Sequence, residues 1–122
     1  MLKRIALVGV VALLLGTAAI ARDDDRYGAI AYSRHTGHYG YWHGAESRAG
    51  AERRAREACD RRDCRVEVWF RNSCGALASG EDSEIFGWGH DVSLGEAKEI
   101  AIRNCRREGG RHCRVLVSSC AR

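Results

Sequence analysis

The sequence predicts an α+β domain that consists of two tandem β-β-α-β repeats. We expect about six strands in one sheet, two helices on one face of that sheet, and stabilisation by disulfide bonds. Three observations predict this fold. The same short motifs occur twice in the same order, two segments have helical periodicity, and all six cysteines lie in the repeated part.

The chain begins with the features of an export signal. Lys3 and Arg4 precede an apolar stretch over 5–15, and small residues follow at 19–21, the order found in secretory signal peptides. About eleven apolar residues are too few for a stable membrane-spanning helix. We therefore predict a signal peptide at 1–21, a short acidic segment at 22–26, a single domain at 27–122, and a secreted or periplasmic protein with no membrane span after cleavage.

The remaining 101 residues are poor in residues that build a core. Val, Ile, Leu and Phe number only 14, a fraction that is typical of disorder. The net charge is small, however, because removing Lys3 and Arg4 from the 20 basic residues leaves 18 against 16 acidic ones. This balance gives no reason to expect a nucleic-acid partner. An even number of cysteines in an exported chain indicates a disulfide framework instead.

The first repeat, 27–74, reads as two strands, a helix and a strand. Strands are expected at 28–33 and 39–43 around a loop that contains glycine. A helix is expected from Ser47 to Cys59, with Ala51 and Ala55 on the same face as Cys59. The third strand follows Cys64, where valines alternate with polar residues.

The second repeat, 75–122, presents the same motifs. Tyr27-Gly28-Ala29-Ile30-Ala31 recurs as Cys74-Gly75-Ala76-Leu77-Ala78, and Cys64-Arg65-Val66-Glu67-Val68 recurs as Cys113-Arg114-Val115-Leu116-Val117. Gly87 follows Gly75 by the same twelve residues that separate Gly40 from Gly28. A helix is expected from Ser93 to Cys105, with Glu96 completing a capping box and a stripe of small residues at Ala97, Ala101 and Cys105.

The repeat restricts how the cysteines pair. Bridges lie either within each copy, as Cys59–Cys64 and Cys105–Cys113, or between equivalent residues, as Cys59–Cys105 and Cys64–Cys113. We prefer the first scheme, because a tight helix-to-strand turn already brings those residues close. Cys74 and Cys120 then remain, and would tie the middle of the domain to its end.

Several of these phrases resemble a known family. The segments Trp69-Phe70-Arg71-Asn72-Ser73-Cys74-Gly75-Ala76-Leu77-Ala78 and Gly28-Ala29-Ile30-Ala31-Tyr32-Ser33, the helix start at Ser47 to Glu52 and the strand start at Cys64 to Val66 are similar to a bacterial family of secreted proteins, domain of unknown function 4189. The resemblance covers about Tyr27 to Cys120. It implies export and a small cysteine-bearing domain, and supplies no catalytic residues. Family members usually have Ala where this chain has Arg53, Arg54 and Arg56.

Aromatic residues supply the candidate binding surface. Five of the nine lie between Tyr27 and Trp42, and strand alternation places Tyr39, Tyr41 and His43 on one face and Trp42 on the other. At least one set should be partly exposed, and exposed Tyr and Trp are favoured at binding hot spots. The alternative is that these rings complete the core. The candidate binding residues are Tyr39, Tyr41, Trp42, His43, Trp88 and His90.

Other clusters are interpreted as surface features. His35, His38 and His43 lack a spare cysteine to complete a metal site, so no metal or other cofactor is expected. Asp23 to Asp25 should be solvated, and Glu52 and Glu57 should pair with the arginines of the first helix. Glu81, Asp82 and Glu84 form a loop cluster that sugar chemistry could use, although such acids usually serve solubility.

No catalytic signature is found. The chain has no Gly-x-Ser-x-Gly, no His-Glu-x-x-His and no phosphate-binding loop, so we expect no catalytic residues. Two function classes remain. The first is an exported, non-enzymatic module that binds another envelope or secreted protein, such as an inhibitor or immunity-type factor. The alternative is a binder of peptidoglycan or other cell-wall glycan, or, as a weaker alternative, a cell-wall hydrolase.

Overall fold

The structure, a computed structural model, describes residue 9 and residues 24–122. The predicted signal peptide therefore lies outside the described residues, apart from one glycine. Two β-β-α-β units follow one another along the chain, as predicted. Their elements are β1 (Tyr27–Tyr32), β2 (Tyr39–Ala45), α1 (Arg48–Cys59) and β3 (Arg65–Arg71), then β4 (Cys74–Ser79), β5 (Phe86–Asp91), α2 (Leu94–Arg107) and β6 (Arg114–Cys120). Within the described part of the chain, no helix is long and apolar enough to cross a membrane.

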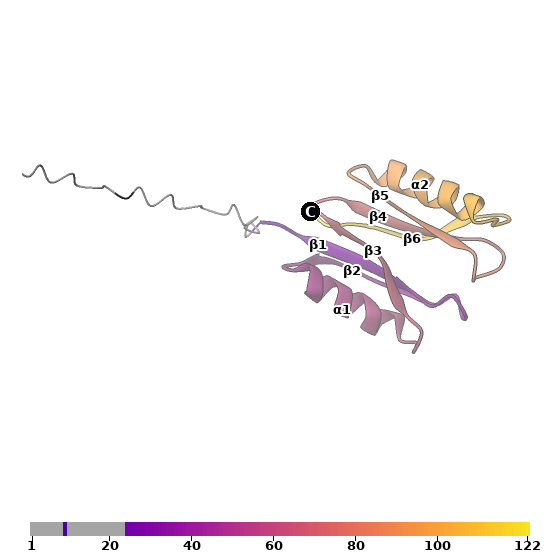
Figure 1. The fold of residues 1–122 in the computed structure, drawn as a ribbon, viewed down its shortest axis with the longest axis horizontal. Coiled ribbons are helices and arrows are strands. Elements are labelled where there is room, and N and C mark those ends of the chain that lie inside the picture. Colours follow the sequence, from indigo (N-terminus) through magenta and orange to yellow (C-terminus); the bar gives the residue numbers. More distant parts are fainter. Residues whose placement is uncertain (1–8, 10–23) are drawn as a thin grey trace, which may run out of the picture.

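The strands form two antiparallel sheets of three strands. Their orders are β2-β1-β3 and β5-β4-β6. Figure 1 shows four layers, with α1 outside the first sheet, α2 outside the second, and the two sheets facing each other between the helices. The α+β class, the six strands, the two helices and the tandem units are confirmed. The single sheet with both helices on one face is corrected to two sheets, each with its own helix.

The central strands explain why two sheets form. All six residues of β4 and all but the first of β1 are buried. In β1, Ile30 and Tyr32 join the core between the sheets, whereas Ala29 and Ala31 pack against α1. Both faces of the strand are therefore apolar. A single sheet with helices on one side would leave the larger side chains uncovered, and packing two sheets face to face buries them.

The helices lie very close to the sheets. Their small-residue stripes, Ala51, Ala55, Cys59 and Ala97, Ala101, Cys105, are buried as predicted. Gly40 in β2 and Gly87 in β5 lie directly beneath the helix backbones, so that a Cβ atom at Gly40 would overlap Cys59 and one at Gly87 would overlap Cys105. The repeated glycines are thus required by close approach.

Three disulfides fasten the units. Cys59–Cys64 and Cys105–Cys113 close the two helix-to-strand turns, with Cα atoms 6.2 and 6.1 Å apart. Cys74–Cys120 joins β4 to β6 with Cα atoms 4.0 Å apart. The preferred within-copy scheme is confirmed, and the bridges between equivalent cysteines do not form.

Residues 25, 26 and 121, which flank the domain, lie beside the junction of the two units. The backbone N–H of Asn72 donates to the carbonyl of Arg26, and that of Ala121 donates to the carbonyl of Ser73, at 2.9 and 2.8 Å. Asp25 is buried here and accepts from Arg71 and Asn72 at 2.5 and 2.8 Å. The expectation that the acidic segment is merely solvated is therefore wrong for Asp25, because a basic side chain of β3 reaches it.

Candidate functional site

The internal repeat creates two related rows of rings between the sheets. Tyr41 of β2 lies opposite Ile30, and Trp88 of β5 lies opposite Leu77. Because paired residues of neighbouring strands point to the same face, both rings lie on the side that faces the other sheet. Each is 44% exposed, since β2 and β5 are edge strands. The predicted binding residues are thus divided between two edges of the molecule.

The first row, on β2, contains most of the predicted residues. Tyr39 and Tyr41 lie opposite Tyr32 and Ile30, whereas Trp42 lies opposite Ala29, on the side of α1. The predicted separation of the two tyrosines from Trp42 is therefore confirmed. Both sets are partly exposed, so these rings do not simply complete the core. His43 is exposed near the end of the same strand.

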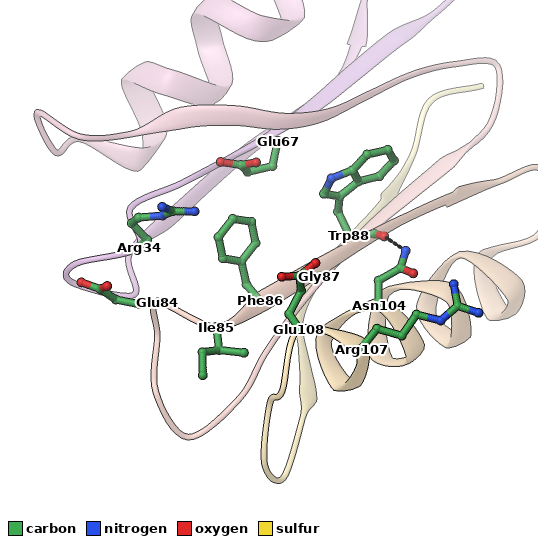
Figure 2. Close-up of a pocket in the computed structure, with 10 residues that line it drawn as sticks. All are labelled: Arg34, Glu67, Glu84, Ile85, Phe86, Gly87, Trp88, Asn104, Arg107 and Glu108. Carbon is green, nitrogen blue, oxygen red and sulfur yellow. Dashed lines mark hydrogen bonds between the residues drawn. The ribbon is translucent and has the colours of Figure 1, made fainter.

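The second row borders a cleft between β3 and β5. Two adjoining hollows of about 600 and 500 Å³ share Glu67 of β3 and Trp88 of β5 in their linings. We call them together the β3–β5 cleft. Figure 2 shows the larger one, with Glu67 extending from β3 toward the opening that Phe86 and Trp88 of β5 also border. His90 lines the smaller hollow.

Glu67 is the unusual residue of this cleft. It is the extra residue of a β-bulge, because Ile30 and Ala31 pair with Val68 and Val66 and leave Glu67 without a partner on β1. Its side chain is half-buried, and burial raises the pKa of its carboxyl, which the nearby Arg65 and Arg34 lower to a smaller extent. Among the described residues, no side chain or backbone group forms a hydrogen bond or an ion pair with this carboxylate.

The loop at one end of the cleft is held rigidly. The Arg34 guanidinium lies over the Phe86 ring, 5.3 Å from its centroid. Phe86 contacts the buried Tyr32 ring, whose hydroxyl donates to the carbonyl of Ser83 at 2.6 Å. Ser83 Oγ in turn donates to the carbonyl of Arg34 at 2.7 Å. These bonds lock the β1–β2 and β4–β5 loops together, so the mouth of the cleft is preorganised.

The strand that carries Trp88 is also fixed. Asn104 of α2 donates from Nδ2 to the carbonyl of Trp88 at 2.9 Å, and His90 Nε2 lies 2.9 Å from Ser73 Oγ. His90 therefore has a structural partner, whereas the Trp88 ring has no ring or cation partner within residues 24–122. Of the two predicted residues on β5, Trp88 is the stronger candidate for contact with a ligand.

The remaining exposed rings lie on the other side of the first sheet, beside α1. Arg54 lies over Trp42 at 4.5 Å from the ring centroid, and Arg48 lies over Trp69 at 4.2 Å. Tyr27 stacks on Trp69 with centroids 6.5 Å apart. The arginines of α1 thus cover rings as well as pairing locally with Glu52 and Glu57.

The other polar clusters have structural partners. His35 Nδ1 lies 2.9 Å from Glu84 Oε1, His38 Nε2 lies 3.1 Å from an Arg61 nitrogen, and His112 contacts Glu81. Glu81 and Glu84 are therefore engaged by histidines, and of the three acids of this loop Glu84 alone is in the lining of the β3–β5 cleft. Within residues 24–122, no group of three His, Cys, Asp or Glu side chains is arranged to hold a metal ion.

Sequence reasoning missed Glu67, Arg34 and Phe86 as cleft residues. A signal for Glu67 was present, because it is the one polar mismatch between the repeated segments Val66-Glu67-Val68 and Val115-Leu116-Val117. No comparable signal marked Arg34, since the packing of its loop against the second unit depends on the facing sheets.

Comparisons with known proteins agree with this architecture. A family model described as "Domain of unknown function (DUF4189)" matches residues 27–120. Among solved structures, the chain is similar to the one titled "NMR structure of Rv1813c from Mycobacterium tuberculosis", with 27% sequence identity and a TM-score of 0.57; the match covers 98% of this chain and 95% of that one. No curated protein matches the chain.

Proposed function

The chain belongs to the DUF4189 family, and from that premise we propose that it is an exported, non-enzymatic module that binds another protein of the bacterial envelope or its surroundings. Export is supported by the three disulfides, which persist in oxidising compartments. It is also supported by the signal-like composition of residues 1–21.

The observation that carries the proposal is the β3–β5 cleft. Trp88 offers a large ring on a fixed backbone, and such rings act as anchors in protein interfaces. The cleft lies between β3 and β5, which have no neighbouring strand on their outer sides in the described structure. An extended segment of a partner would place side chains between the sheets and bond its backbone to one of these edges. An inhibitor or an immunity-type factor would act through such a contact without any catalysis.

A glycan of the cell wall is the second candidate. The observation that favours it is the combination of the Phe86 and Trp88 rings with carboxylate and amide groups of Glu67 and Asn104 along one cleft. Apolar faces with a few polar groups are typical of small-ligand sites. A hydrolase would require two carboxyl groups on either side of the scissile bond. Besides Glu67, the cleft is lined by Glu84, which is engaged by His35, and by Glu108, which is exposed at the rim.

A capture experiment distinguishes these candidates. The full, oxidised chain is immobilised and exposed to periplasmic extract, and a recovered partner is purified and its Kd measured. We expect Trp88→Ala to weaken binding by about 30-fold, as loss of a hot spot of about 2 kcal/mol would. Trp42→Ala is the matched control, because its similarly exposed ring lies beside α1, and it should leave the Kd unchanged. Retention on purified peptidoglycan, with no stoichiometric protein partner, would favour the glycan instead.

A further inference from the structure

The internal repeat relates the β3–β5 edge to the β2–β6 edge, and the two edges differ at one partly buried position, the bulge residue of β3 and of β6. In the second unit, Leu77 and Ala78 pair with Val117 and Val115, so Leu116 is the bulge residue of β6, as Glu67 is of β3. Leu116 packs against the core between the sheets. The fold therefore accepts an apolar residue at this bulge, and the carboxylate of Glu67 is not needed to build it.

A carboxylate at this position has an energetic cost. Half-burial without a hydrogen-bond partner disfavours its charged form. Residues that break a local rule with no structural gain are expected at functional sites. Glu67 therefore distinguishes the β3–β5 edge from the β2–β6 edge. The same edge carries Trp88, where the other carries Tyr41.

The other charges around the cleft form no ion pair with Glu67 in the described structure, although Arg65 and Arg34 lie near enough to lower the pKa of its carboxyl. Arg71 is paired with Asp25, and Glu84 contacts His35. Arg107 and Glu108 are exposed side chains of opposite charge at the rim. Arg34 lies over Phe86, and forms no ion pair with Glu67 in the described structure. An unpaired carboxylate next to an exposed indole is a combination that attracts organic cations, through charge and through the ring face.

We propose that the β3–β5 cleft recognises a basic side chain, lysine or arginine, with Glu67 as its counter-ion and the Trp88 ring as the surface on which its alkyl stem or charged group rests. This inference rests on the proposed function, and it specifies the partner segment as a basic one. A cationic group would form the ion pair that the carboxylate lacks, and would recover the cost of its burial only in the complex.

The test uses tetralysine as the probe on the full, oxidised, ¹⁵N-labelled chain. The three indole N–H signals are assigned with Trp→Phe variants, and tetralysine and tetraglutamate are titrated in turn. We expect tetralysine to shift the Trp88 signal and tetraglutamate not to. Glu67→Gln, which keeps the shape of the side chain, should weaken tetralysine binding by about tenfold. Glu46→Gln removes an exposed carboxylate elsewhere, and should leave the affinity unchanged.

A double variant tests the site by moving it. Glu67→Leu with Leu116→Glu exchanges the two bulge residues, and each incoming residue type already occupies the equivalent bulge of the other unit. Tetralysine should then perturb the ring of Tyr41 and leave Trp88 unaffected. Persistence of the shift at Trp88 in this folded variant, or equal affinity of the wild type and Glu67→Gln, would overturn the inference.

The inference and the proposed function fail separately. If a captured protein depends on Trp88 and binds Glu67→Gln with full affinity, the basic-side-chain inference is wrong and the protein-binding function stands. If tetralysine binding requires Glu67 and no captured protein depends on Trp88, the cation site stands and the protein-binding function is wrong.

Discussion

At the scale of single residues, Glu67 and Asp63 make the stability of the protein depend on pH in opposite directions. Burial raises the pKa of Glu67 above its ordinary 4.5. The hydrogen bond that Ser33 Oγ donates to Asp63, at 2.6 Å, lowers the pKa of Asp63 below its ordinary 3.8. An acid with a raised pKa binds its proton more tightly in the folded state, so its contribution to stability falls as the pH rises. The contribution of Asp63 falls as the pH drops below its ordinary pKa.

The first prediction follows from this sign. In wild type, deprotonation of Glu67 should lower the free energy of unfolding as the pH rises from about 4.5 upward, and Glu67→Gln should remove that decline. Thermal melts at pH 3 to 7 measure the effect. The difference in Tm between the variant and wild type should grow with pH. A difference that is constant with pH would show that Glu67 titrates normally in the folded state. Asp63→Asn serves as the comparison, since its Tm difference should instead shrink toward pH 3.

At the scale of elements, the two units have different interactions at the same pair of cross-strand positions. Tyr27 pairs with Arg71 across β1 and β3, with the guanidinium 5.9 Å from the ring centroid. At the equivalent place in the second unit, Cys74 pairs with Cys120 and forms a disulfide. The first sheet is held there by a contact that water and salt weaken, and the second by a covalent bond.

The second prediction concerns that bond. Cys74–Cys120 closes a loop with a sequence separation of 46, against 5 and 8 for the two short bridges. Loop-closure entropy predicts a loss of about 4 kcal/mol for Cys74→Ser with Cys120→Ser, and about 2 to 2.5 kcal/mol for removal of either short bridge. Denaturant unfolding of the three paired variants gives the order. A larger loss from Cys105→Ser with Cys113→Ser would mean that packing around α2 outweighs the chain entropy.

Helix capping shows how far local sequence signals reach. Ser93 Oγ accepts from the backbone N–H of Glu96 at 3.3 Å, as the capping box predicted, and Ser47 Oγ accepts from that of Gly50 at 3.1 Å. The other half of the capping box differs, because the Ser93 N–H donates to Asp91 Oδ2 at 2.8 Å rather than to Glu96. Signals within a few residues, such as caps, stripes, alternation and short disulfides, were therefore readable. The bond to Asp91 could not be predicted in this way, because it depends on the direction of the chain between the end of β5 and the start of α2.

At the scale of the whole molecule, Phe70 joins the two sheets. Its ring lies against Gly28 of β1 and Gly75 of β4, where the absence of side chains leaves room for it. The equivalent residue of β6 is Ser119, so a single ring fills the centre that two equivalent residues would otherwise share. The core of a chain with few aliphatic residues therefore depends strongly on one side chain.

The third prediction tests that dependence. Phe70→Ala should lower the free energy of unfolding by about 3 to 5 kcal/mol, because no neighbouring side chain can fill the space against two glycines. Trp69→Ala is the control on the same strand, and should cost about 1 kcal/mol, because its ring is 39% exposed. Urea unfolding measures both. Similar losses for the two variants would show that the contact between the sheets is not the main source of stability.

The arrangement of the sheets was the part that the sequence did not reveal. The repeat, the element order and the cysteine pairing depend on neighbours in the chain, and they were predicted. Whether Ile30 and Leu77 lie in one sheet or face each other across two depends on contacts between the units, which no local pattern specifies. Arg34, Glu67 and Phe86 were missed as cleft residues for the same reason, since the cleft exists only between the two facing sheets.

The hydrogen bonds at the junction of the two units make the connectivity of the chain interchangeable. Residues 26 and 121 lie beside residues 72 and 73, so that β1 starts and β6 ends close to the place where the chain passes from one unit to the other. A short linker from residue 122 to residue 24, with new ends opened between Asn72 and Ser73, would reverse the order of the units and leave every layer where it is. The two orders of the units are therefore expected to be equivalent circular permutations of one fold.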